Sequence, residues 1–193
     1  MNKNNIILLI FIIVVVLILS YFAYKYYAEN LVQMYATENL EQKIITVVDP
    51  LNTTYSFDGR LIRLVNGKAQ INIASGLAEK IEVSVFGVPI FEDLNNDGVK
   101  DASLILVYAQ GGSGIFYFIA SALKDVENNL TIGTNAIYLG DRIMPQSVLV
   151  DSGKITANYL DRKKDEPFST QPSINVSRYF LLSEKTLVED LGK

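Results

Sequence analysis

The residues best suited to chemistry are acidic and amide side chains in one nine-residue segment, DLNNDGVKD, which covers residues 93–101. Side-chain oxygens stand at its positions 1, 3, 5 and 9, and a backbone carbonyl at position 7 completes a set that can wrap a calcium ion in one tight loop. The glycine at position 6 permits the sharp turn that such a loop needs. The predicted calcium ligands are Asp93, Asn95, Asp97, the carbonyl of Val99, and Asp101.

A metal-free turn between two strands is the alternative for the same segment, because Asn, Asp and Gly also build tight turns through local hydrogen bonds. The pattern departs from an EF-hand, since Leu104 replaces the final glutamate and strand-like residues follow instead of a helix. In this respect the segment resembles the loops of integrin-type propeller repeats and dockerins. We therefore expect a structural Ca²⁺ ion that fixes a loop whose carboxylates repel one another.

The composition excludes most other chemistry. The chain has no Cys and no His, which excludes thiol redox chemistry, disulfides, the usual zinc sites and catalysis by Ser-His-Asp or Cys-His groups. A net charge of −4 without a long basic block argues against nucleic acid as a partner. Two pairs of neighbours, Asp141-Arg142 and Asp161-Arg162, are interpreted as local ion pairs that hold loops. A hydrolase that uses carboxylates in a cleft near these two loops is the alternative function.

The first element along the chain is a long apolar segment. Of the first 28 residues 22 are apolar, and no charged residue lies between Lys3 and Lys25. As a helix, residues 6–27 are long enough to cross the hydrocarbon of a bilayer, and tyrosines cluster where the helix should leave it. We predict an uncleaved signal anchor at residues 1–28, with the lipid bilayer as its partner. A cleaved signal peptide and a pilin-like subunit are the alternatives.

Charge sets the orientation that we expect for this anchor. The N-terminal tail carries the α-amine and Lys3, whereas Glu29, Glu38 and Glu41 follow the apolar segment. Because positive flanks stay in the cytoplasm, we expect a single-pass protein of the cell membrane with a cytoplasmic N-terminus and an extracytoplasmic C-terminal domain. Residues 29–52 are expected to form a stalk or linker that is partly helical, and residues 53–193 the folded domain.

The folded domain has the turn signals of an antiparallel β structure. Tight-turn signals at Asp58-Gly59 and Asn66-Gly67 separate the segments TYSF, RLIRLV and KAQINI, which predicts a meander. Hairpin tips are predicted at Gly111–Gly114 and Asp151–Gly153. The spacing of these segments favours a mainly β domain, as an antiparallel sandwich, a roll or a small barrel, and Phe118–Glu127 is the place for one short helix.

Several phrases of this domain together resemble a family of uncharacterised bacterial envelope proteins, which have a membrane anchor and a small domain with a calcium loop. The resemblance spans about residues 53–182 and rests on LVNG, the loop at 93–101, GGSGIFY, TNAIYLGDRI and DRKKDEPFSTQPS. The family's loop reads Gly-Asp-x-Asn-Gly-Asp-Gly, whereas Glu92 and Asn96 replace its glycines here. Lys164-Asp165 likewise stands where the family carries Pro-Gly. The resemblance implies a location and an architecture, and no known activity.

These features together predict a membrane-anchored extracytoplasmic binding or structural module with one structural calcium ion, and we infer no catalytic activity from them. Its further partner would be an envelope protein or a glycan. All 21 acidic residues follow the anchor, so the domain is more acidic than the net charge of −4 suggests, as suits a domain exposed to calcium.

Overall fold

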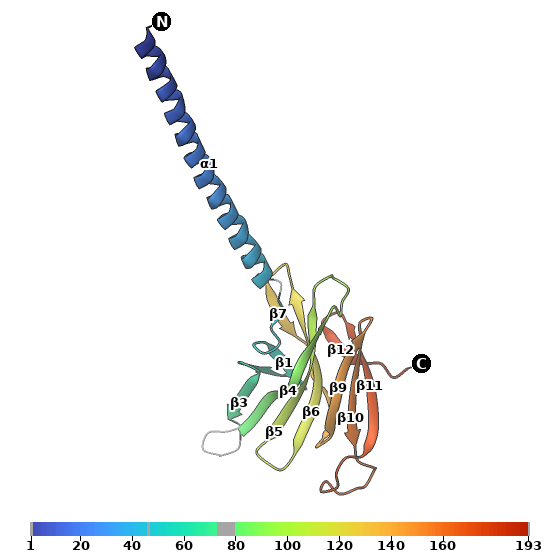
Figure 1. Ribbon diagram of the computed structural model, residues 1–193. Coiled ribbons are helices and arrows are strands. Elements are labelled where there is room, and N and C mark those ends of the chain that lie inside the picture. Colours follow the sequence, from blue (N-terminus) through green and yellow to red (C-terminus); the bar gives the residue numbers. More distant parts are fainter. Residues whose placement is uncertain (1, 46, 73–79, 193) are drawn as a thin grey trace. The chain divides into compact units, whose positions relative to one another are not determined.

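The computed structural model describes residues 2–45, 47–72 and 80–192 and divides the chain into two compact units, Met1–Ile45 and Thr46–Lys193 (Figure 1). The first unit is one helix, α1 (Lys3–Ile45), and the second is built from antiparallel strands. The predicted fold class, a mainly β structure preceded by an N-terminal apolar helix, is therefore confirmed.

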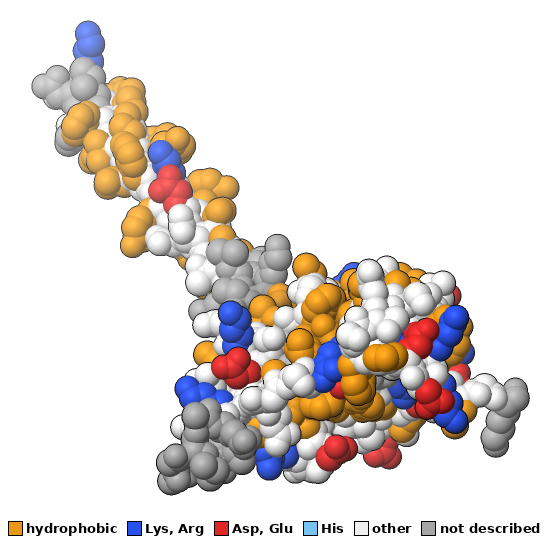
Figure 2. All heavy atoms as spheres, turned by 90° about the horizontal axis from the view of Figure 1, so that it is seen from below, with side chains coloured by type: hydrophobic (Ala, Val, Ile, Leu, Met, Phe, Trp, Pro, Cys, Tyr) orange, Lys and Arg blue, Asp and Glu red, His pale blue; other side chains and the backbone are white. Residues whose placement is uncertain are grey.

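Helix α1 forms from a sequence that contains neither Gly nor Pro, the two residues that most disfavour helix interiors. Its stretch Ile10–Thr37 is long and apolar enough to cross a membrane, and none of this stretch is buried inside the protein. Apolar side chains cover much of the visible helix surface in Figure 2, whereas charged side chains are spread over the β unit. By length and composition, this helix fits a single membrane span or a signal sequence. It continues to Ile45 through residues that we expected to be partly helical.

The described residues of the second unit form twelve strands, most of them short. In chain order they are β1 (Thr54–Phe57), β2 (Arg60–Arg63), β3 (Lys68–Asn72), β4 (Lys80–Glu92), β5 (Asp101–Gln110), β6 (Ile115–Asp125), β7 (Leu130–Gly133), β8 (Ile137–Asp141), β9 (Met144–Asp151), β10 (Lys154–Asp161), β11 (Ile174–Ser183) and β12 (Thr186–Glu189). They pair as a β1–β2 ribbon, a sheet in the order β3-β4-β5-β6-β7 with β8 also on β6, and a sheet in the order β12-β11-β10-β9.

The six-stranded sheet is covered on both of its faces. On one face, Ile62 of the β1–β2 ribbon belongs to the same core as Leu104 of β5. On the other face, Ile105 of β5 belongs to a second core with Phe180 of the four-stranded sheet. Because both faces are covered, β5 is buried without alternation from Asp101 to Leu106.

The predicted short helix at Phe118–Glu127 is wrong. Most of these residues belong to β6, which pairs with β5 on one side and with β7 and β8 on the other. The run from Ile119 to Lys124 is continuously buried, so it lacks the period-two alternation that marks a strand with one solvated face. Pairing with neighbouring strands and burial on both faces decide the structure of this segment against its local helix-forming residues.

The turn signals predicted the hairpins but not every strand pairing. Asp58 and Gly59 have φ angles of 47° and 85°, and Asn66 and Gly67 have 52° and 76°, as tight hairpin turns require. The predicted tips after β5 and after β9 also connect paired strands. The meander, however, ends after β2, because β3 pairs with β4 and meets the preceding segment only at the Val65–Lys68 bridge among the described residues.

Two polar side chains connect elements of the two larger sheets. The side-chain amide of Asn135 bonds to both backbone polar groups of Leu187 in β12. Its Oδ1 accepts the N–H of Leu187 at 2.8 Å, and its Nδ2 donates to the carbonyl of Leu187 at 3.0 Å. Arg178 of β11 forms two hydrogen bonds of 2.6 Å to the carboxylate of Glu189 and one of 2.6 Å to the carbonyl of Tyr138 in β8.

Candidate functional site

The predicted calcium segment connects β4 to β5. Glu92 of β4 pairs with Asp101 of β5 at the base of this loop. Leu94 anchors the loop, because it is only 5% exposed and belongs to the core between the two larger sheets. Asn96 and Gly98 have φ angles of 61° and 85°. Both residues thus adopt the left-handed conformation, which asparagine tolerates better than most other residues and glycine adopts freely.

Short polar contacts hold the first three predicted ligands in place. Asp93 Oδ2 accepts the N–H of Gly98 at 2.9 Å, and Asn95 Oδ1 accepts the N–H of Asp97 at 3.0 Å. Asn95 Nδ2 donates to Asp97 Oδ2 at 2.8 Å, and Asp97 Oδ1 accepts the N–H of Val99 at 2.8 Å. These contacts are those of successive Asx turns, so side-chain oxygens on backbone N–H groups shape the loop.

Asp101 differs from the other predicted ligands because it is fully buried, with 0% exposure. Its Oδ2 accepts the N–H of Leu94 at 3.1 Å, and its Oδ1 accepts the N–H of Lys124 at 2.9 Å. Burial raises the pKa of Asp101 above its ordinary value, against the lowering effect of these two hydrogen bonds. The carboxylate of Asp101 therefore ties the loop to β6.

The oxygen atoms of the loop suit a hard cation, but they are not gathered into a cage. Carboxylate and amide oxygens are the ligands that Ca²⁺ prefers, and a carboxylate oxygen that accepts one N–H keeps a lone pair for a second partner. Among the residues that the structure describes, no group of three or more acidic side chains converges as a metal site. The inward orientation of Asp101 accounts for part of this arrangement. Calcium binding by this loop stays a prediction.

A hollow of about 570 Å³ lies beside the loop. Asn95 and Asp97 line it from the loop side, and Asp125 and Lys185 line it from the turns after β6 and β11. Lys185 Nζ lies 3.9 Å from Asp125 Oδ2, and hydrogen bonds from Asn128 are the main cause that lowers the pKa of Asp125. Apolar side chains, among them Val99, Val126 and Ile132, line the hollow together with these polar residues.

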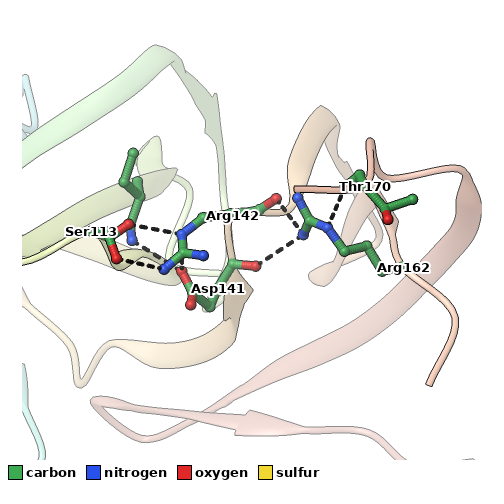
Figure 3. Close-up of polar contacts among 6 residues, drawn as sticks. Ser113, Asp141, Arg142, Arg162 and Thr170 are labelled. Carbon is green, nitrogen blue, oxygen red and sulfur yellow. Dashed lines mark hydrogen bonds and ion pairs between the residues drawn. The ribbon is translucent and has the colours of Figure 1, made fainter. Parts of the chain in front are cut away.

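A second group of polar contacts joins three connections of the β unit, namely the β5–β6 tip, the β8–β9 turn and the β10–β11 loop (Figure 3). We call it the arginine cluster. Its residues are Ser113, Asp141, Arg142, Phe168, Arg162 and Thr170.

Arg142 lies directly after β8, with a φ angle of 50°. Its Nε donates to the carbonyl of Ser113 at 2.8 Å and lies 3.5 Å from Asp141 Oδ1. The same oxygen of Asp141 accepts the N–H of Ile115 at 3.0 Å. The predicted local ion pair of Asp141 and Arg142 is confirmed, and it holds the β5–β6 tip against the β8–β9 turn.

Arg162 contacts main-chain carbonyls instead of the carboxylate of its neighbour. Its Nη1 donates to the carbonyl of Arg142 at 2.9 Å, and its Nε donates to the carbonyl of Thr170. Asp161 Oδ1 accepts the backbone N–H of Arg162 at 2.7 Å. Within the described part of the chain, the guanidinium of Arg162 forms no ion pair, so the prediction of a side-chain ion pair between Asp161 and Arg162 is wrong.

An exposed aromatic ring lies beside both arginines. Phe168 is 59% exposed, and its ring centroid lies 4.4 Å from the guanidinium carbon of Arg142 and 5.9 Å from that of Arg162. Both distances are within the range of cation–π interactions. Asp165, on the same loop, has a φ angle of 70°, in the left-handed region that favours glycine.

Sequence reasoning did not identify Ser113, Phe168 and Thr170 as members of a cluster, because they come together only through the fold. One signal could have pointed to them. The phrases GGSGIFY, TNAIYLGDRI and DRKKDEPFSTQPS, which carry much of the resemblance, each contribute to the arginine cluster.

Neither the fold nor these two sites could be assigned through known relatives. No protein-family model, no curated protein and no solved structure matches the chain. The functional argument therefore rests on the residues of this chain and their geometry.

Proposed function

We propose that this protein is a membrane-anchored binding or structural module of the bacterial cell envelope. In this proposal α1 is an uncleaved signal anchor that crosses the bilayer once, and the β unit lies outside the cytoplasm. The observation that carries the proposal is the stretch Ile10–Thr37, which is long and apolar enough to cross a membrane and is not buried inside the protein. So large an apolar surface needs a lipid environment.

The β4–β5 loop is proposed to hold one structural calcium ion. Asp93, Asn95 and Asp97 place side-chain oxygens on a single tight loop, and the carbonyl of Val99 and the carboxylate of Asp101 complete the proposed ligand set. The ion would offset the repulsion between the three carboxylates and fix the loop on the side of the hollow. Outside the cell, calcium is abundant enough to fill even a weak site of about 10⁻⁴–10⁻³ M.

The contacts around Asp141 favour the module over the hydrolase. A carboxylate that acts in hydrolysis must reach a substrate, whereas Asp141 Oδ1 lies 3.5 Å from Arg142 Nε and accepts the N–H of Ile115 at 3.0 Å. Asp161 similarly accepts the N–H of Arg162 at 2.7 Å. These are the contacts of carboxylates that hold loops.

Thermal unfolding of the full chain in detergent micelles, with calcium or with chelator, tests the calcium proposal. Calcium should raise the midpoint by about 2–8 °C, the shift that corresponds to about 1 kcal/mol for a domain of this size. Asp97→Asn should abolish the shift, because the amide keeps the Asx-turn oxygen but loses the charge. Asp58→Asn removes one charge from a turn far from the loop and should leave the shift unchanged. Identical melts with calcium and with chelator would contradict the proposal.

A further inference from the structure

The arginine cluster contains a guanidinium, that of Arg162, which has no carboxylate within ion-pair distance among the residues that the structure describes. Arg162 donates to the carbonyls of Arg142 and Thr170, and it forms no ion pair within the residues that the structure describes. Carbonyl groups satisfy N–H donors but carry no net charge. The partly buried guanidinium of Arg162 is therefore held by carbonyls and not by a direct ion-pair partner, and its fork geometry suits a carboxylate or a phosphate.

The neighbouring Arg142 has the carboxylate of Asp141 as its ion-pair partner, at a long distance. Arg142 lies 3.5 Å from Asp141 Oδ1, beyond the usual length of a charge-assisted hydrogen bond, and that oxygen already accepts the N–H of Ile115 at 3.0 Å. The strongest contact of Arg142 is with the carbonyl of Ser113, at 2.8 Å. Both guanidinium groups are thus oriented by the backbone, so their orientation does not depend on a bound partner (Figure 3).

Phe168 adds an apolar wall to this pair of cations. Its ring centroid lies within 4.4 Å and 5.9 Å of the two guanidinium carbons, and 59% of the side chain is exposed. An apolar group next to a charge lowers the local dielectric constant and strengthens the interaction of that charge with an incoming anion. Two guanidinium groups in fixed positions beside an exposed aromatic ring thus offer an incoming anion charged N–H donors next to an apolar surface.

We propose that Arg142 and Arg162, with Phe168 beside them, bind an oxyanion, the phosphate or carboxylate group of a ligand. The site gives the proposed binding module a ligand class, and to that extent it rests on the proposed function. It does not involve the calcium loop. The chain has a net charge of −4, so a free anion is not drawn to this protein by its overall charge, and saturable binding would have to come from a local site.

Arginine modification by phenylglyoxal on the wild-type full chain tests the proposal without any substitution. In dodecyl maltoside micelles, which carry no oxyanion, inorganic phosphate should slow the modification of Arg142 and Arg162 severalfold, as measured by peptide mass spectrometry. The exposed Arg60 and Arg63 of β2 are internal controls and should react at unchanged rates. Nanodiscs that contain phosphatidylglycerol, without added phosphate, test a lipid headgroup as the source of the oxyanion. Modification rates of Arg142 and Arg162 that change neither with phosphate nor in the phosphatidylglycerol nanodiscs would overturn the proposal.

Isothermal titration calorimetry with sodium phosphate provides the second measurement. Arg162→Gln should weaken binding about tenfold or more, because it removes a charge-assisted contact, and Arg162→Lys should weaken it less. Lys164→Gln removes the same charge from an exposed position of the same loop and should change the affinity less than about twofold. An equal loss in both variants would show general charge attraction and overturn the site. The phosphate affinity should be the same in calcium and in chelator. A failure of the calcium proposal would therefore leave the result for the oxyanion site unaffected.

Discussion

Individual carboxylates in this protein have different partners, and the partner decides what each one does. Asp101 is buried against two backbone N–H groups, Asp97 shapes an exposed turn, and Asp141 holds a loop tip. Glu189 instead forms a bidentate ion pair, since both of its carboxylate oxygens lie 2.6 Å from nitrogens of Arg178. Residue type alone does not distinguish these roles, because each follows from the neighbours that the fold supplies.

The pair of Arg178 and Glu189 should make stability depend on pH. The hydrogen bonds from Arg178 lower the pKa of Glu189 below its ordinary value of 4.5. Because the folded-state pKa is the lower one, the stabilisation is fully present above pH 4.5 and is lost as the pH falls through the folded-state value. Glu189→Gln should therefore lower the free energy of unfolding by about 1 kcal/mol near neutral pH, as partly exposed ion pairs do, and by less in acid.

Denaturant unfolding of the full chain at neutral and at acidic pH measures this difference. Glu82→Gln is the matched control, because the carboxylate of Glu82 bonds to the neutral side chain of Gln70 at 2.7 Å. Its effect on stability should be similar at both pH values. If Glu189→Gln costs the same in acid as at neutral pH, the ion pair does not supply the stabilisation assigned to it here.

At the scale of elements, short-range sequence signals predicted the helix and the tight turns, because interactions between residues close in sequence determine these structures. The apolar run and the absence of Gly and Pro predicted the helix, and Asp58-Gly59 and Asn66-Gly67 predicted tight turns with positive φ angles. Partner choice was not predictable in this way. The pairing of β3 with β4 and the double burial of β6 depend on strands that are distant in sequence, so the meander and the short helix were expected wrongly.

The same distinction applies to the two candidate sites. The residues of the β4–β5 loop are close in sequence, so the loop and its glycine-dependent turn could be predicted. The arginine cluster could not, because Ser113, Arg142 and Arg162 meet only where three separate connections come together. The positive φ angle of Arg142 and the contacts of Arg162 with main-chain carbonyls are consequences of tertiary contacts, and no sequence motif encodes them.

β1 packs so closely against Gly133 of β7 that a side chain at this position should destabilise the protein. A Cβ atom added to Gly133 would lie 2.2 Å from the carbonyl oxygen of Thr54, on the backbone of β1, which cannot move aside cheaply. The neighbouring Ser56 also bonds this segment, since its N–H donates to the carbonyl of Thr134 at 3.2 Å. Gly133→Ala should therefore lower the free energy of unfolding by about 3 kcal/mol or more, as overpacked sites with rigid surroundings do.

Gly112 provides the matched control in the β5–β6 tip. A Cβ atom added there would meet its nearest neighbour, the carbonyl oxygen of Gln110, at an ordinary 3.9 Å. Gly112→Ala should stay within about 0.5 kcal/mol of the wild type in the same denaturant titration. Comparable losses in the two variants would mean that alanine at either glycine acts through backbone flexibility and not through the close approach of β1.

At the scale of the whole molecule, the two units have surfaces of opposite character. The stretch Ile10–Thr37 exposes apolar side chains along a helix, whereas the β unit buries apolar residues in two cores and carries most of its charged side chains on its surface. A chain of this kind can satisfy both surfaces at once if a bilayer receives the helix and water receives the β unit. The acidic residues that follow the apolar segment, and the α-amine and Lys3 before it, lead us to expect export of the β unit.

This orientation can be tested with single cysteines, because the chain has none of its own. Lys164→Cys places a thiol on the exposed β10–β11 loop, and Asn2→Cys places one in the N-terminal tail. A membrane-impermeant maleimide applied to intact bacterial spheroplasts should label Lys164→Cys and should label Asn2→Cys only after lysis, since Lys3 and the α-amine keep the tail inside. Labelling of Lys164→Cys only after lysis would place the β unit in the cytoplasm, where calcium is scarce, and would contradict both the orientation and the environment that the calcium loop needs.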